Sequence, residues 1–259
     1  MSAVGGAPEA VRLPAWATLA LAPNPGPMTL DGTNTWVVRA PGASSCVVVD
    51  PGPLHQAHLE RVAAYGPVEL VLLTHRHPDH AEGAGRFAEM TGAPVAAADP
   101  SLVRGAQPLW DGQVLDGHGG VRVRVLATPG HTSDSVSFVV EDDEPGVLTG
   151  DTVLGRGTTV VAHPDGVLGD YLRSLDLLRG LGPARVLPGH GPLRASAVVA
   201  AEAYLEHRRA RLEQVRAALA AGARTASDVV QLVYADVDRA VWPAAEQSVR
   251  AQLAYLRGE

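Results

Sequence analysis

The sequence contains no lysine and only one cysteine among its 259 residues. Each of its 21 basic residues other than histidine is therefore an arginine, which excludes a lysine nucleophile and Schiff-base chemistry. A single cysteine cannot form an intramolecular disulfide. Because Cys46 lies in an apolar run that predicts a strand, we interpret it as a small buried hydrophobe rather than a reactive thiol.

Long apolar runs and an excess of positive charge are also missing. No run approaches the ~18 apolar residues that cross a membrane, and residues 1–12 lack the basic and apolar regions of a secretory signal. We therefore expect a cytoplasmic protein without a membrane partner. The net charge of −7 argues against broad attraction to nucleic acid, although it leaves room for a local basic patch.

The stretch from Thr74 to His80 contains three histidines and one aspartate. The apolar residues 68–73 before it predict a buried strand, which would deliver these side chains to a sheet edge, where open α/β folds bind ligands. Nitrogen and oxygen donors at this density suit Zn²⁺ or another first-row metal. A polar surface turn is the alternative, but matching ligands recur downstream and favour the metal.

The same arrangement recurs further along the chain, where a short apolar strand ends in a tight turn with a metal-type side chain at its tip. Together the candidate ligands are His75, His77, Asp79, His80, His131, Asp151 and His190. They are too many for one tetrahedral ion and suit two ions about 3.5–4 Å apart.

We expect each of the two ions to take three of these residues. His75, His77 and His131 would hold the first ion, Asp79, His80 and His190 would hold the second, and Asp151 would bridge them. Two zinc ions per chain are expected, although manganese and iron also suit such ligands. Asp79 is in addition the candidate catalytic residue, because its carboxylate could orient an attacking hydroxide.

The motifs that contain these ligands resemble those of the metallo-β-lactamase superfamily. They are His75-x-His77-x-Asp79-His80, Gly130-His131-Thr132, Gly150-Asp151 and Gly189-His190-Gly191. The resemblance spans about residues 15–195. It implies an α/β fold, the αββα sandwich of two sheets with helices on both outer faces, and a dinuclear site between the sheet ends.

Four further segments resemble a narrower, lactamase-β-like branch that includes a mitochondrial single-strand endoribonuclease. They are residues 24–27, 32–35, 50–53 and 188–192. That branch carries a C-terminal winged-helix-like domain. We therefore expect a catalytic domain over residues 1–194 and a helical, winged-helix-like domain over residues 195–259, with the β-wing shortened and nucleic-acid binding weakened accordingly.

The sequence predicts a metal-dependent hydrolase but leaves its substrate open. The narrower resemblance favours single-stranded RNA, whereas the acidic charge and short C-terminus favour a small molecule. Small-molecule options are a thioester or lactone, as in glyoxalase II or acyl-carrier thioesterases, and weak β-lactamase activity. A non-catalytic metal-binding scaffold is a further alternative, and an apolar face of the C-terminal segment could form a homodimer.

Three other residues are candidates for substrate binding. Asn34 and Thr35 either contact substrate or fix a turn, and His163 lies in a loop that the resemblance places near the mouth of the site. His55 and His58 follow a turn on a predicted amphipathic helix, and we expect both to be solvated.

Overall fold

The computed structural model describes residues 11–161 and 163–258 and contains two five-stranded sheets. The first has the strand order β1 (Ala17–Leu21), β2 (Asn34–Val38), β3 (Cys46–Val49), β4 (Val68–Leu72) and β5 (Val95–Ala96). The second has the order β10 (Arg185–Pro188), β9 (Gly146–Gly150), β8 (Val136–Val140), β7 (Arg122–Ala127) and β6 (Val114–Asp116). Residues 1–10, where no secretory signal is expected, lie outside the described part.

The two sheets pack face to face, and helices cover both outer faces. Strand β3 illustrates the layering, because successive side chains of a strand point to opposite faces. Val47 and Val49 join the apolar core between the sheets, whereas Cys46 and Val48 pack under the helices α1 (Gln56–Ala63) and α3 (Ala84–Thr91). The expected αββα sandwich is confirmed, and so is the burial of Cys46.

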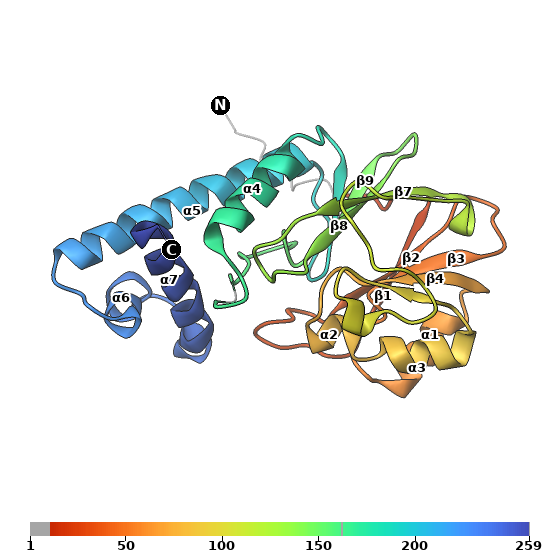
Figure 1. Ribbon diagram of the computed structural model, residues 1–259, viewed down its shortest axis with the longest axis horizontal. Coiled ribbons are helices and arrows are strands. Elements are labelled where there is room, and N and C mark those ends of the chain that lie inside the picture. Colours follow the sequence, from red (N-terminus) through yellow and green to blue (C-terminus); the bar gives the residue numbers. More distant parts are fainter. Residues whose placement is uncertain (1–10, 162, 259) are drawn as a thin grey trace, which may run out of the picture.

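Helices α4 (Leu168–Arg179) and α5 (Ala197–Ala220) cover the second sheet (Figure 1). The same long helix α5 then leads away from the sandwich to α6 (Ala226–Val233) and α7 (Trp242–Arg257). Its first half packs with α4, and its second half, with Val215 and Ala218, joins a separate apolar cluster with α6 and α7. Because α5 contributes to both clusters, the boundary at residues 194 and 195 stays a prediction.

The strands that carry candidate ligands all end at the same edge of the sandwich. In the first sheet β3 and β4 are parallel. In the second, β7 and β9 are each antiparallel to β8, and β10 is parallel to β9, so β7, β9 and β10 run in one direction. This shared direction brings the segments after β4, β7, β9 and β10 together, which positions the site.

Most predicted elements are present, with one clear correction. The sequence predicts one helix over about residues 80–90, but the structure has two helices there, α2 (Pro78–Ala81) and α3. The break occurs because the Gly83 N–H donates to the Gly52 carbonyl (2.9 Å) instead of continuing the helical ladder. Strands β1 and β6 were not predicted. No helix among the described residues is both long and apolar enough to cross a bilayer.

Candidate metal centre

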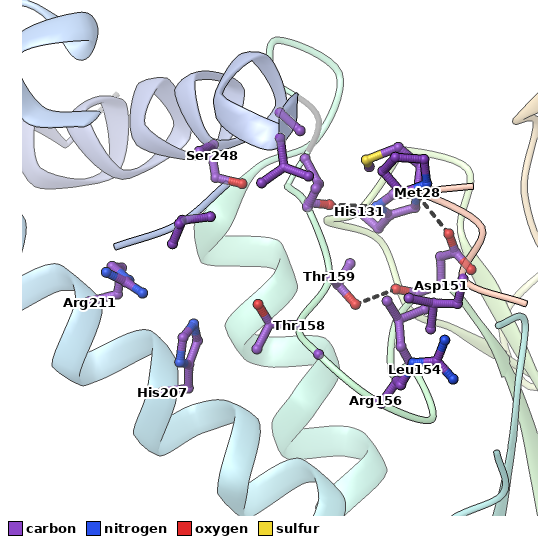
Figure 2. A pocket seen from close by; sticks show the side chains of 18 of the residues that line it. Met28, His131, Asp151, Leu154, Arg156, Thr158, Thr159, His207, Arg211 and Ser248 are labelled. Atoms are coloured by element: carbon purple, nitrogen blue, oxygen red, sulfur yellow. Dashed lines mark hydrogen bonds and ion pairs between the residues drawn. The ribbon is translucent and has the colours of Figure 1, made fainter. Parts of the chain in front are cut away.

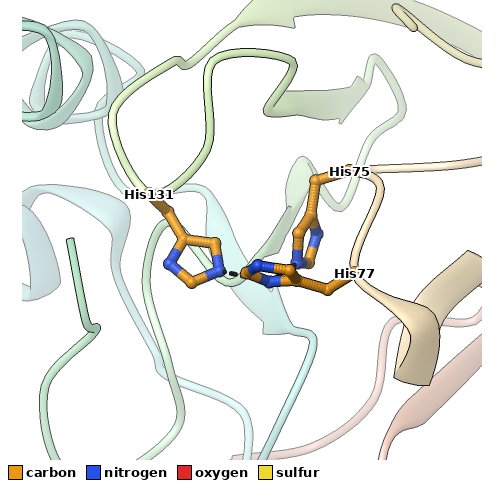
Figure 3. A group of neighbouring side chains, drawn as sticks. All are labelled: His75, His77 and His131. Atoms are coloured by element: carbon orange, nitrogen blue, oxygen red, sulfur yellow. Dashed lines mark hydrogen bonds between the residues drawn. The ribbon is translucent and has the colours of Figure 1, made fainter. Parts of the chain in front are cut away.

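Three histidines from two loops point their ring nitrogens at one another (Figure 3). His75 and His77 follow β4, and His131 follows β7. His77 Nδ1 lies 3.0 Å from His75 Nε2 and 2.9 Å from His131 Nε2. Converging nitrogen lone pairs of this kind are what a tetrahedral metal ion requires, and the three residues are those expected to hold the first ion.

The second group forms beside the first. His80 Nε2 and His190 Nε2 are 3.2 Å apart. Asp79 Oδ2 lies 3.4 Å from His80 Nε2 and 3.1 Å from His190 Nε2. Asp79, His80 and His190 are therefore brought together as predicted.

Asp151, at the end of β9, lies between the two groups. Its Oδ1 is 3.4 Å from the Nε2 atoms of both His80 and His190, and its Oδ2 is 3.8 Å from His131 Nε2. Each carboxylate oxygen therefore faces a different group, which is the placement that a bridging ligand needs.

The donor set fits a pair of bound metal ions. Asp151 Oδ1 is buried and has no hydrogen-bond partner in the described part of the chain, and a buried carboxylate oxygen of this kind is costly unless a cation pairs with it. Burial would raise the pKa of Asp151, but His190 and His80 hold it well below its usual range. The carboxylate is therefore ionised and ready to bind a cation.

Hydrogen bonds behind the ligands fix which ring nitrogen faces the site. Asp50 Oδ2 accepts from His80 Nδ1 (2.8 Å) and from Thr74 Oγ1 (2.6 Å). Because the Thr74 hydroxyl donates to Asp50, it accepts from His75 Nδ1 at 3.0 Å. The Nε2 atoms of His75 and His80 are left free for a metal, as outer-shell partners of histidine ligands generally arrange.

Backbone carbonyls orient the other two histidines whose Nε2 atoms face the site. His131 Nδ1 donates to the Val160 carbonyl (2.5 Å), and His190 Nδ1 donates to the Gly32 carbonyl (3.1 Å). These bonds tie the ligands to two distant segments of the chain.

Two glycines allow the loops to approach closely enough. A Cβ at Gly189 would lie 2.6 Å from Asp151 Oδ1 and 2.7 Å from His80 Cε1. A Cβ at Gly150 would lie 2.5 Å from Thr74 Oγ1, and its φ of +48° is itself unfavourable for other residues. The Gly in each motif therefore makes room for the ligands next to it.

The three candidates for substrate binding lie apart from this cluster. Asn34 is buried and donates to the carbonyls of Pro188 (2.9 Å) and Gly191 (2.8 Å), so it fastens the His190 loop to β2. Thr35 is also buried, and its hydroxyl lies 3.0 Å from His58 Nε2. His163 lines a cavity between α4 and α7 that contains none of the candidate ligands.

Sequence reasoning was wrong about one residue and missed two others. His58 is 2 % exposed rather than solvated, and Arg61 and Thr35 contact its ring. The roles of Asp50 and Thr74 were not foreseen. Asp50 directly follows β3, and that position at a strand end, which the ligands share, was the available signal.

A cavity of about 360 Å³ opens beside His131 and Asp151 (Figure 2). One wall comes from the sandwich, with Met28, Leu30 and Leu154, and the opposite wall comes from the C-terminal helices. The helical wall contains His207, Arg208, Arg211, Tyr234, Val237, Val241, Ala244, Ala245 and Ser248. The cavity is therefore enclosed by both parts of the chain.

Comparison with known proteins agrees with this geometry. The family model described as Metallo-beta-lactamase superfamily matches residues 28–190, and that described as Beta-lactamase associated winged helix domain matches residues 225–259. The chain is 31% identical to a "Beta-lactamase-like protein 2 homolog" of Drosophila melanogaster, over 97% of this chain and 91% of the relative.

Two further relatives are informative. The chain is 33% identical to an "Atrochrysone carboxyl ACP thioesterase" of Aspergillus chevalieri, over 89% of this chain and 77% of the relative. The crystal structure of a metallo-beta-lactamase family protein from Thermus thermophilus superimposes with a TM-score of 0.79 at 28% identity, covering 94% of this chain and 93% of that one.

Proposed function

The chain belongs to the metallo-beta-lactamase superfamily and is a metal-dependent hydrolase, and we propose that it hydrolyses the thioester of a small or carrier-bound acyl group. The observation that carries this proposal is the cavity that joins the metal-type residues to apolar side chains on both of its walls, among them Met28, Leu30 and Val241. Such a cavity suits an acyl chain whose carbonyl reaches the metal centre. A relative whose name describes a thioesterase supports the same substrate class.

The residues of the site would bind metal and orient a water molecule toward the thioester bond. We propose that the seven predicted ligands hold two metal ions, zinc in the first instance, which would supply Lewis acidity and lower the pKa of a water molecule toward ~7. Asp79 is charged, because His80 and His190 lower its pKa by more than burial raises it. Its side chain is 27% exposed, so it can accept a hydrogen bond from this water and orient its oxygen toward the thioester carbonyl.

The reaction is balanced without any other reactant. The water oxygen bonds to the carbonyl carbon, the carbon–sulfur bond breaks with its electrons on sulfur, and the departing thiolate takes up a proton from the water. The products are a carboxylic acid and a thiol.

The single-stranded RNA favoured by the narrower resemblance stays a prediction. Among the arginines of α5 that could have formed a nucleic-acid surface, Arg208 is buried and Arg216 pairs with Glu213. These two arginines therefore do not offer the exposed, unpaired charge that attracts a phosphate backbone. A cytoplasmic location, a homodimer and a domain boundary at residues 194 and 195 are likewise proposals.

Assays of thioester and RNA substrates side by side test the proposal. We would load the protein with zinc and assay S-lactoylglutathione, a hexanoyl thioester of N-acetylcysteamine and a fluorescent single-stranded RNA. We expect thioester hydrolysis that falls at least about 100-fold in Asp79→Ala, in line with the loss of one positioned catalytic group. RNA cleavage without thioester cleavage would overturn the proposal in favour of a nuclease.

A further inference from the structure

Arg208, on α5, is a buried arginine without an acidic partner among the described residues. It is 3 % exposed and lines the cavity described above. Its Nη2 donates to the carbonyl of Thr159, and its guanidinium carbon lies 4.9 Å from the centre of the Tyr171 ring. Neither contact neutralises its charge, and none of the ion pairs formed within residues 11–161 and 163–258 includes Arg208.

One N–H donor of the Arg208 guanidinium, at Nε, has no hydrogen-bond acceptor among the described residues. Four buried side-chain nitrogen or oxygen atoms in the described residues have no hydrogen-bond partner. Two belong to the Gln252 amide, which does not line the cavity, and the others are Asp151 Oδ1 and Arg208 Nε. A buried charge with an unpaired donor is costly unless a counter-charge arrives. Asp151 would receive its counter-charge from the proposed metal ions, so Arg208 is the group still in need of one.

A second arginine faces the same space from one helical turn away. Arg211 lines the cavity, donates to the Val233 carbonyl (3.0 Å) and lies 4.3 Å from the centre of the Tyr234 ring. Like charges at this helical spacing repel each other. Figure 2 shows Arg211 and His207 projecting from α5 toward the segment with Thr158 and Thr159.

The cavity offers these arginines no acid of its own. Asp151 is the only acidic residue among those that line it, and it belongs to the metal centre. Two exposed arginines nearby do have acidic partners, because Arg216 pairs with Glu213 and Arg250 pairs with Glu246. The positive charge on the cavity side of α5 is therefore left uncompensated by the described residues.

We propose that Arg208 and Arg211 bind an anionic oxygen group of the substrate, so that the preferred thioesters carry a carboxylate or a phosphate. This inference rests on the proposed function, because it assigns a substrate class to the same cavity. The anion has two sources, the far end of the acyl chain or the carrier to which the acyl group is attached.

Paired ligands that differ only in the anion test this inference. We would measure, by calorimetry on the zinc-loaded protein, the binding of thioether analogues in which a methylene replaces the thioester carbonyl. One acyl chain ends in a methyl group and the other, equally long, in a carboxylate. A second pair has the pantetheine carrier with and without its phosphate. The variants are Arg208→Gln and Arg211→Gln, and Arg209→Gln, exposed on the same helix, is the control.

We expect one anionic analogue to bind roughly tenfold or more tighter than its neutral partner, as hydrogen bonds to a charged group permit. Arg211→Gln, at a half-buried position, should reduce that preference at least about threefold, and Arg209→Gln should leave it intact. The pair that shows the preference identifies the source of the anion. Equal binding within both pairs, or a preference that survives in both cavity variants, would overturn the inference.

The measurement separates this inference from the proposed function. Binding of non-hydrolysable analogues does not require turnover, so a preference for the anion without any thioesterase activity would uphold the site and refute the reaction. Thioester hydrolysis with equal binding of charged and neutral analogues would uphold the reaction and refute the anion site. If Arg208→Gln does not fold, Arg211→Gln decides the matter.

Discussion

Asp50 shows how much of the metal centre depends on residues that are not ligands. Its carboxylate receives hydrogen bonds from the Thr74 backbone N–H (2.8 Å), the Thr74 hydroxyl and His80 Nδ1. Its φ of +51° is uncommon for a side chain other than glycine. A charged acceptor held in this position orients His80 and, through Thr74, also His75.

We predict that Asp50→Asn weakens zinc affinity or activity by about 10–100-fold, the usual effect of removing an outer-shell partner. Asparagine tolerates the left-handed backbone, so the change tests the charge rather than the fold. Competition with a chromogenic chelator measures the affinity. Asp176→Asn, which removes an exposed partner of Arg179, is the control, and an equal effect of the two variants would contradict the assigned role.

The burial of His58 leads to a prediction about the pH dependence of stability, because burial favours the neutral ring. Burial and, after it, the charge of Arg61 lower the pKa of His58 to about 4, from 6.5. In the unfolded chain His58 takes up a proton near pH 6.5, whereas in the folded chain it stays neutral down to about pH 4. Its contribution to stability is therefore complete above about pH 6.5 and is lost as the pH falls toward 4.

Urea unfolding of the wild type and of His58→Gln at pH 7 and pH 5 tests this sign. We expect the drop in unfolding free energy between the two pH values to be smaller in the variant by roughly 2 kcal/mol, since one pKa unit corresponds to about 1.4 kcal/mol. His118→Gln, at a half-exposed position, should behave like the wild type. An unchanged pH dependence in His58→Gln would show that its ring is not held neutral.

The loops at the strand ends act as units, and their glycines set how closely they meet. We predict that Gly189→Ala lowers bound zinc from two ions toward one per chain, because the new methyl group would occupy the space of Asp151 Oδ1 and His80 Cε1. Metal analysis after dialysis measures this. The control is Gly169→Ala on α4, where the added methyl would make only ordinary van der Waals contacts, and this variant should keep both ions. Retention of two ions in Gly189→Ala would mean that the loops can separate without loss of the site.

The elements that present the ligands were predictable because their signals are local. Residues 46–49 are a continuous apolar run, as expected for a strand that is buried on both faces, and residues 68–72 are apolar except for the exposed Glu69. The sequence Thr225-Ala226-Ser227-Asp228 is typical of a helix start, and in the structure Thr225 and Asp228 form a capping box at the start of α6. Strands β1 and β6 lack a continuous buried run, because only the first and fourth residues of β1 are buried and all three residues of β6 are at least partly exposed.

The grouping of the candidate ligands could also be predicted, but the residues that form hydrogen bonds with those ligands could not. Seven ligand-type side chains in turns after apolar strands leave few arrangements, and the structure brings those residues together as expected. The contacts of Asn34 and Thr35 join segments far apart in the sequence. His58 precedes Leu59 on the buried side of α1, and only the packing of that helix shows that its ring points inward.

At the scale of the whole molecule, the C-terminal helices have an apolar cluster of their own and also form one wall of the cavity beside the candidate metal centre. Residues of α5, of α7 and of the segment 234–241 that follows α6 line it opposite the candidate metal centre. We therefore expect substrate length to depend on side chains far along the chain from any metal ligand.

Ala244→Phe tests this expectation, because it adds a large side chain to the helical wall. We predict that kcat/KM falls roughly tenfold more for a decanoyl than for an acetyl thioester, in keeping with the sensitivity of apolar pockets to a few methylene groups. Steady-state kinetics with both substrates provides the ratio. Ala203→Phe, at an exposed position of α5, is the control, and equal losses for both acyl lengths would contradict a cavity wall at Ala244.

We propose that seven residues form one dinuclear metal centre that performs hydrolysis, namely His75, His77, His131, Asp79, His80, His190 and Asp151. A zinc titration of the metal-free protein, followed by bound metal and by thioester hydrolysis in the same samples, tests it most directly. We predict that binding saturates at two ions per chain, that activity reaches its plateau at the same point, and that Asp151→Asn loses both. Full activity at one ion or none, or two tightly held ions in Asp151→Asn, would contradict the account.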